Sequence, residues 1–323
     1  MAALAWFAAL SAHAEVADRV ARIKGRGELV CGILPGVAGF ARVDPQGSYS
    51  GFDIDTCRAI AVAILARPDQ VRFVAAASVS QLESDADLDL VVRRLTWTMS
   101  REAETGLLYG PVTFYDGQGF LVTKSSGLTS SSDFSGKRIC VDPGEDWSRN
   151  LAGYLKSRAI PATLVMTGGR ADGEKRFFSR QCDVYSADRS MLGAIRADAP
   201  RQADYLILPE MISEEPLAPL MRQGDDRFFL VVRWTIFAMI DAEVLGITSK
   251  NADSEIGQLM GGARASGKAL GLDENWAYRV VSAVGNYGEM YDRNLGPDGA
   301  IRLDRDRNRL WTQGGLIYAP PLR

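Results

Sequence analysis

Residues 28–33, ELVCGI, begin an alternation of short β-rich runs and helical patterns that decides the fold. The runs VRFVAA at 71–76 and LDLVV at 88–92 follow, with one helix expected from about Asp53, its N-cap, and a short one near Ser80. Strands that alternate with helical patterns are typical of βαβ units. We therefore expect a parallel sheet with helices packed on it.

The same pattern recurs in the middle of the chain. β-rich runs at 137–142, 162–167 and 182–187 alternate with helices expected from about Asp146 and around 174–178. A second α/β lobe similar to the first is therefore predicted.

Extended runs at 205–209 and 217–223 should lead back to the first lobe, where a long amphipathic helix is expected at 226–245. We expect the lobes to move about the strands near 120–124 and 217–223. The expected boundaries are 1–14 for a signal segment, 15–121 for the first part of lobe 1, 122–216 for lobe 2, and 217–323 for the return to lobe 1 with a C-terminal extension.

Charge and histidine content exclude several classes of function. Lys and Arg total 37 against 40 Asp and Glu, which gives a net charge of -3 and no attraction to nucleic acid or anionic lipid. The single histidine, His13, lies inside the expected signal segment. Histidine-based nucleophilic catalysis and histidine metal sites are thereby excluded from the mature chain, and we expect no metal or cofactor. Acid–base chemistry by carboxylates stays possible.

The apolar run at 2–14, AALAWFAALSAHA, ends in the small-x-small pattern Ala12-His13-Ala14 that precedes a secretory cleavage site. It is shorter than the roughly 20 residues that a spanning helix needs. We expect an exported protein whose mature chain starts at Glu15. An interfacial anchor or a disordered tail is the alternative.

Four cysteines, Cys31, Cys57, Cys140 and Cys182, fit an exported protein, because an even number can pair completely. Three connectivities are possible. Pairing Cys31 with Cys57 and Cys140 with Cys182 keeps each bridge inside one lobe, and we favour it over four free buried thiols.

Polar side chains follow three of the predicted strands. Thr96, Thr98 and Arg101 come after the run LDLVV, VDPGEDW follows a strand that ends at Val141, and SADRS follows one that ends at Tyr185. In open parallel sheets ligands bind outside the carboxyl ends of strands, near helix N-termini. These groups therefore predict a binding cleft between the lobes, with Trp97 as a core aromatic that braces the loop.

Several long motifs carry a resemblance to a known family. They are GFDIDTCRAIA, TWTMSRE, VTFYDGQGF, CDVYSADRS, ILPEMISEEPLAPLMRQGDDRFFLVVRWT, GKALGLDENWA, AVGNYGE and GGLIYAPPLR. Together, from about Gly27 to Arg323, they resemble the general L-amino-acid-binding periplasmic proteins of polar amino-acid ABC transporters. The resemblance implies a two-lobed periplasmic binding protein fold of type II, with two parallel-core sheets joined by two crossover strands. It also implies a monomer that closes around one amino acid and delivers it to a membrane permease.

The resemblance assigns roles to five residues. Thr98 and Arg101 match the threonine and arginine that hold the ligand α-carboxylate. Asp188 matches the acid that takes the α-ammonium, with help from backbone near Thr96, and Phe40 matches an aromatic that packs on the ligand. A buried zwitterion needs a donor fork and an anion, because an unpaired buried charge costs roughly 3 to 5 kcal/mol. Without the resemblance, Arg101 would be interpreted as a surface side chain and Asp188 as an ordinary helix N-cap.

The sequence departs from the family at the start of the second-lobe helix. Gly144, Glu145 and Asp146 stand where the family has small hydroxyl residues whose free backbone N–H groups face the carboxylate. Arg94 and Leu95 stand where it favours Asn and Thr. We hypothesise that closure pairs Arg94 with Glu145 or Asp146 across the lobes. Acidic side chains that point to solvent as caps are the alternative, and inward-pointing ones would favour ligands with a cationic side chain.

Three functions fit these patterns. The first is a binding protein without catalysis that closes by hinge motion. The second is a secreted enzyme on the same fold, dehydratase-like, with Glu145 or Asp188 as general acid. The third is a diverged receptor that signals to a sensor partner.

Overall fold

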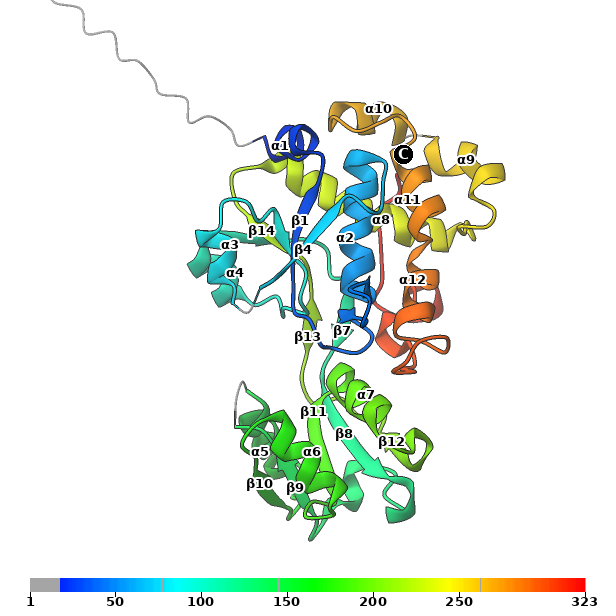
Figure 1. Cartoon of the computed structure of the whole chain (residues 1–323). Coiled ribbons are helices and arrows are strands. Elements are labelled where there is room, and N and C mark those ends of the chain that lie inside the picture. Colours follow the sequence, from blue (N-terminus) through cyan, green and yellow to red (C-terminus); the bar gives the residue numbers. More distant parts are fainter. Residues whose placement is uncertain (1–17, 77, 144–145, 262, 323) are drawn as a thin grey trace, which may run out of the picture.

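The computed structural model describes residues 18–76, 78–143, 146–261 and 263–322, which form two α/β lobes joined by extended strands (Figure 1). The expected signal segment 1–14, with His13, lies outside the described residues. Within these ranges, no helix combines the length and the apolar character that crossing a membrane requires.

The first lobe is built on a five-stranded sheet in the order β4-β1-β5-β14-β6. β1 pairs in parallel with β4 and with β5, which confirms the predicted parallel core. The returning strand β14 runs antiparallel between β5 and β6. The strands of this sheet are β1 (Leu29–Ile33), β4 (Val71–Ala75), β5 (Leu90–Val91), β6 (Leu107–Tyr109) and β14 (Leu220–Arg222).

Helix α2 (Phe52–Leu65) begins after Gly51, so the predicted N-cap Asp53 lies one residue inside the helix. Gly51 has φ 133°, and a Cβ on it would lie 2.1 Å from the carbonyl oxygen of Phe40. The close approach of two backbone segments therefore fixes the start of the helix, which a capping pattern alone does not reveal. Nearly every side chain of α2 is buried, because the helix contacts β1 and β4 as well as α8 (Asp226–Val244) and α11 (Trp276–Val284).

A buried ion cluster ties α1 (Arg19–Arg26) to this sheet. Asp89 is 0% exposed and accepts hydrogen bonds from the guanidinium groups of Arg19 and Arg26 and from the backbone N–H of Val30. The remaining elements of the lobe are β2 (Arg42–Val43), β3 (Tyr49–Ser50), α3 (Ser80–Ser84), α4 (Met99–Thr105), α9 (Ala252–Met260), α10 (Ala263–Ala269) and α12 (Tyr287–Asn294).

The second lobe repeats the plan with a sheet in the order β10-β9-β11-β8-β12. β9 pairs in parallel with β10 and β11, whereas β8 runs antiparallel to β11 and β12. Its strands and α-helices are β8 (Gln118–Thr123), β9 (Arg138–Val141), α5 (Trp147–Ser157), β10 (Thr163–Met166), α6 (Arg170–Phe178), β11 (Val184–Asp188), α7 (Arg189–Asp198) and β12 (Tyr205–Ile207).

Two short antiparallel strands, β7 (Phe114–Asp116) and β13 (Glu215–Leu217), connect the lobes (Figure 1). The predicted boundary between residues 121 and 122 falls inside β8, which already belongs to the second sheet. The crossing therefore lies a few residues earlier than expected. An apolar run such as GFLVT gives no sign of where a hinge strand ends and a core strand begins.

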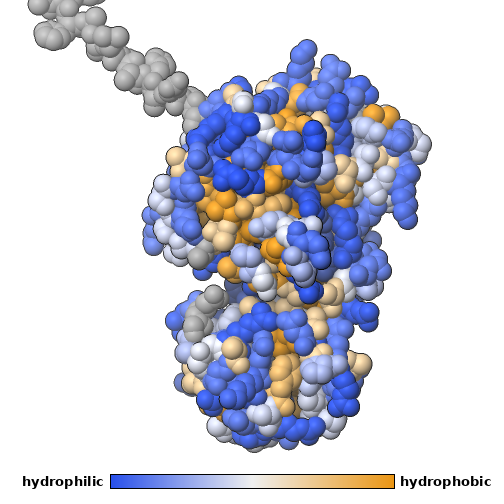
Figure 2. All heavy atoms as spheres, viewed as in Figure 1, coloured by the Kyte–Doolittle hydropathy of each residue, from blue (hydrophilic) through white to orange (hydrophobic). Residues whose placement is uncertain are grey.

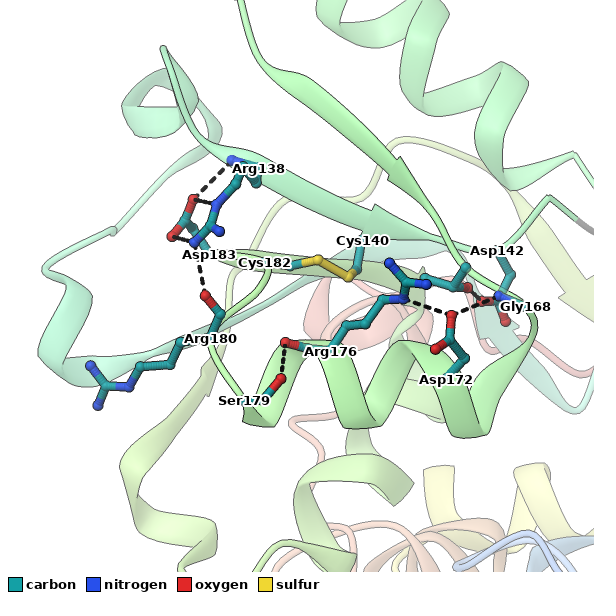
Figure 3. Close-up of a disulfide and its surroundings, with 11 residues drawn as sticks. Arg138, Cys140, Asp142, Gly168, Asp172, Arg176, Ser179, Arg180, Cys182 and Asp183 are labelled. Carbon is teal, nitrogen blue, oxygen red and sulfur yellow. Dashed lines mark hydrogen bonds and ion pairs between the residues drawn. A yellow bond between two sulfur atoms is a disulfide. The ribbon is translucent and has the colours of Figure 1, made fainter.

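Both predicted disulfides are confirmed. Cys31 in β1 is bonded to Cys57 in α2, and Cys140 in β9 is bonded to Cys182, which precedes β11. Figure 3 shows the second bridge beside the ion pair of Arg138 with Asp183. Each bridge stays within one lobe, so neither restrains motion between the lobes.

The C-terminal extension after α12 consists of loops and two short 3-10 turns, η4 (Asp306–Asn308) and η5 (Trp311–Gln313). The side chain of Asn308 accepts from the N–H of Tyr115 at 2.7 Å and donates to the carbonyl of Tyr115 at 3.0 Å. In the second lobe, Arg196 of α7 donates to the carbonyl oxygens of Ile301 and Arg302, both at 2.8 Å. The extension thus braces crossing strand β7 and also contacts lobe 2.

Candidate functional site

The surface is hollowed between the two lobes on the side where α4 and α5 lie (Figure 2). On the lobe 1 side, Thr98 is the N-cap of α4, and its Oγ1 accepts from the N–H of Arg101 at 3.3 Å. Arg101 Nη1 donates to the carbonyl oxygen of Thr96 at 2.9 Å. The guanidinium is therefore half-buried over its own turn, with donors to spare beyond this bond.

Trp97 corrects one expectation, because it is 39% exposed and is not a core residue. Its ring stacks on Tyr109 with centroids 5.9 Å apart, and its Nε1–H donates to Glu102 at 2.7 Å. The backbone N–H of Trp97 donates to the carbonyl of Pro216 in β13. An indole with a polar partner at the surface satisfies its N–H without burial. Trp97 still braces the loop, as predicted, but from the surface.

Asp188 is the last residue of β11 and stands at the N-cap position of α7, yet its side chain does not cap the helix. The N–H of Arg189 donates to the carbonyl of Gly117, and the N–H of Ser190 donates to Asp116 Oδ1 at 3.1 Å. Asp116 of the crossing strand thus does the capping. The carboxylate of Asp188 is left to accept a hydrogen bond from Trp147 Nε1–H at 2.9 Å.

The electrostatics around Asp188 favour a cation. Burial, together with the neighbouring carboxylates of Asp116 and Glu215, raises the pKa of Asp188 well above its ordinary value, while Arg94 and the bond from Trp147 lower it. Burial likewise raises the pKa of Asp116, whose Oδ2 is buried without a hydrogen-bond partner. We call Asp116, Asp188 and Glu215 the acidic cluster. An ammonium group entering beside it would replace a proton or a missing counter-charge.

Arg94 already connects the two lobes. Its Nη1 donates to Ser190 Oγ at 2.8 Å, and its guanidinium lies 5.3 Å above the ring of Phe40. Asp146 is paired with Arg149 of its own helix and its side chain is 65% exposed. In this conformation, therefore, the interlobe partner of Arg94 is Ser190 and not Asp146. Pairing on further closure stays a prediction, and Glu145 and Gly144 lie outside the described residues.

Phe40 is 1% exposed and packs edge-on against Phe52 and Phe114. With Arg94 over its ring, it presents almost no surface to a ligand. Its predicted packing on the ligand would require Arg94 to move aside.

Asp53 lies near Arg94 and is buried at 4% exposure. Burial raises its pKa to about 7, against the opposing effect of Arg94 and Arg93. Since this pKa is above the unfolded value, the protonated form stabilises the fold, and that contribution is lost as pH rises toward 7.

The variant Asp53→Asn mimics the protonated carboxyl group. Wild type loses stability as Asp53 ionises, and the variant does not. The difference in free energy of unfolding, variant minus wild type, should therefore increase by about 2 to 3 kcal/mol from pH 5 to pH 8, because one pKa unit is worth about 1.4 kcal/mol. Urea unfolding at the two pH values measures this. The control Asp69→Asn concerns an exposed carboxyl whose pKa is lowered by Arg67, so its effect should be equal at both. Parallel profiles for Asp53→Asn and wild type would contradict the assignment.

Sequence reasoning missed three residues of this region. Asp116 and Glu215 lie on the crossing strands, and Glu215 Oε2 accepts from Thr96 Oγ1 at 2.6 Å. Trp147 begins α5 and is the last residue of the stretch VDPGEDW, whose pattern predicts no role for it. The resemblance identifies only the positions that contact ligand in the family, and these three residues are not among them. Among the described residues, no group of three or more His, Cys, Asp or Glu side chains is placed to hold a metal ion.

Comparison with known proteins gives a consistent result. Residues 29–293 match the family described as bacterial extracellular solute-binding proteins, family 3. The chain is 42% identical to the glutamate/glutamine/aspartate/asparagine-binding protein BztA of Rhodobacter capsulatus, over 98% of this chain and 96% of that protein. It is 38% identical to the general L-amino acid-binding periplasmic protein AapJ of Rhizobium johnstonii, over 98% and 96%.

Among solved structures, the periplasmic binding protein of an ABC transporter from Brucella ovis, with glutathione bound, superposes with a TM-score of 0.84 and 37% identity. The superposition covers 95% of this chain and 100% of that one. Both lobes and both crossing strands lie within these matches. The chain therefore has the type II periplasmic binding protein fold and belongs to the bacterial extracellular solute-binding proteins, family 3.

Proposed function

We propose that the protein captures an L-amino acid between its lobes in the periplasm and delivers it to the permease of an ABC transporter. The observation that carries the proposal is the carboxylate of Asp188, which Asp116 leaves free of helix capping. It stands in an acidic cluster of three carboxyl groups, near one cation, Arg94. The named functions of the relatives BztA and AapJ support the same ligand class.

In this proposal the two ends of the zwitterion are held by different lobes. Arg101 and Thr98 of lobe 1 bind the α-carboxylate, and Asp188 of lobe 2 binds the α-ammonium. The carbonyl oxygen of Thr96, which accepts a hydrogen bond from Arg101, has a second lone pair that can accept from the ammonium group. A ligand that bridges the lobes makes more contacts in the closed state, which is the condition for it to drive closure about β7 and β13.

The ligand side chain is less restricted than its head. Glutathione, bound by the Brucella relative, carries a free α-ammonium and α-carboxylate on its γ-glutamyl residue. Amino acids and glutathione therefore share one head group. We propose that the cleft recognises this head and tolerates side chains of different length.

A thermal-shift screen tests the function. We expect one chemical group among the 20 L-amino acids and glutathione to raise the melting temperature, since a ligand at a hundred times its Kd adds about 2.7 kcal/mol. The D-enantiomer of each hit is the control and should have a much smaller effect. A flat screen would contradict the proposal and favour the diverged receptor.

We further propose that the cleft releases its ligand unchanged and that the protein acts as a monomer. Recovery of the ligand after prolonged incubation, followed by mass spectrometry, distinguishes this from an enzyme in which Asp188 acts as general acid. Any product that accumulates with time and disappears in Asp188→Asn would overturn the proposal of binding without catalysis.

A further inference from the structure

Resting on the proposed function, we infer that Trp147 is the positioning residue that holds the carboxylate of Asp188 ready for the ligand's ammonium group. No other described residue donates a hydrogen bond to the side chain of Asp188. A single indole N–H therefore sets the orientation of the group on which capture by lobe 2 depends.

The residue that carries the indole is itself anchored through its backbone. Trp147 begins α5, and its backbone carbonyl accepts from Gln118 Nε2 at 3.0 Å. Gln118 is 0% exposed, and the same Nε2 donates to Ser186 Oγ at 2.9 Å. The start of α5 is thus fixed to strands β8 and β11, and Asp188 ends the second of these. Donor and acceptor belong to one rigid unit within lobe 2.

A tryptophan suits this role because its indole is a donor only. It occupies Oδ1 of Asp188 and leaves Oδ2, to which no described residue donates, for the ammonium. A serine or threonine hydroxyl could instead turn and accept from a protonated carboxyl. The neutral carboxyl group also keeps an acceptor oxygen, but the indole N–H bonds the ionised carboxylate more strongly. The indole therefore favours the form of Asp188 that binds a cation.

The surroundings make this preference necessary. Asp116 and Glu215 both disfavour the ionised form of Asp188, and burial does so more strongly, which raises its pKa. Of the groups that act on Asp188, Arg94 and Trp147 oppose this rise. Removing the indole N–H should therefore raise the pKa of Asp188 further, so that ligand must displace a proton over a wider range of pH.

The first experiment needs no ligand. The carboxyl group of Asp188 is titrated by carbon-13 NMR in wild type and in Trp147→Phe, which keeps an aromatic ring and loses the N–H. We expect the pKa of Asp188 to be higher in the variant. Trp311→Phe, at a 53% exposed position of the C-terminal extension, is the control and should titrate as wild type. If Trp147→Phe does not fold, β-(3-benzothienyl)alanine at position 147 keeps the bicyclic ring without the N–H. Identical titrations in wild type and the variant would overturn the inference.

The second experiment measures binding of L-glutamine and glutathione by calorimetry from pH 5 to pH 8.5. In Trp147→Phe the acid limb of the affinity profile should move to higher pH, with roughly tenfold weaker binding at the acid end and near-equal binding at the alkaline end. Uniform weakening at every pH would indicate a packing role and overturn the inference. Asp188→Asn separates the two ideas. If it binds as wild type, the proposed site fails, whereas loss in Asp188→Asn with a wild-type profile in Trp147→Phe defeats only the role of Trp147.

Discussion

Arg101→Ala is expected to weaken binding of the amino-acid ligand by about a hundredfold or more. A carboxylate that loses its guanidinium partner in a closed cleft costs roughly 3 kcal/mol, and each 1.4 kcal/mol is a factor of ten in Kd. Isothermal titration calorimetry with the best ligand of the thermal-shift screen measures the change.

Two further variants sharpen this test. Arg101→Lys keeps the charge but loses the planar donor fork, so it should lie between Arg101→Ala and wild type. Arg67→Ala removes an arginine that is 62% exposed in its pair with Asp69 and should bind as wild type. Arg101→Ala also removes the hydrogen bond to the carbonyl of Thr96. Its melting temperature is therefore measured as a control for folding and should stay near that of wild type. A wild-type Kd for Arg101→Ala would count against the assignment of the carboxylate site.

Asp89→Ala is expected to lower the free energy of unfolding of lobe 1 by about 3 to 5 kcal/mol. The change leaves Arg19 buried, at 8% exposure, without its anionic partner, and an abandoned buried charge costs far more than the pair contributes. It also removes the acceptor of the Val30 N–H in the interior strand β1. Denaturant unfolding measures the loss.

The adjacent ion pair supplies the matched control. Asp87 pairs with Arg22 only two residues away, but these side chains are 68% and 43% exposed. Asp87→Ala should therefore cost less than about 1 kcal/mol. Equal losses in the two variants would show that burial does not govern the strength of these pairs.

The two-lobed fold could be predicted from the sequence because it depends on local sequence patterns. Alternating strands and helices predicted both lobes, and the pairing of Cys31 with Cys57 and of Cys140 with Cys182 followed from placing each cysteine in a lobe. The expected helix at 226–245 differs from α8 by one residue. Such features need only neighbours in sequence and one assumption about domains.

The arrangement of the cleft was less readable because its contacts are distant in sequence. Asp116 caps α7 through Ser190, 74 residues away, and Trp147 reaches Asp188 across 41 residues. At the level of sequence Asp188 was a candidate N-cap, and only the competing cap from the crossing strand frees it. Arg94 likewise found Ser190, a neutral partner that no charge pattern marks.

The C-terminal extension has a consequence for the kinetics of capture. The C-terminal extension is hydrogen-bonded to Tyr115 through Asn308, and to Arg196 of lobe 2 through the carbonyls of Ile301 and Arg302. The lobes are therefore connected by the extension as well as by the two crossing strands. Such a tether narrows the set of gaping conformations that the empty receptor samples. The protein then loses less conformational entropy when a ligand binds. A larger part of the contact energy therefore remains as binding free energy. A receptor tethered in this way holds its ligand more tightly, but it opens less widely to admit the ligand.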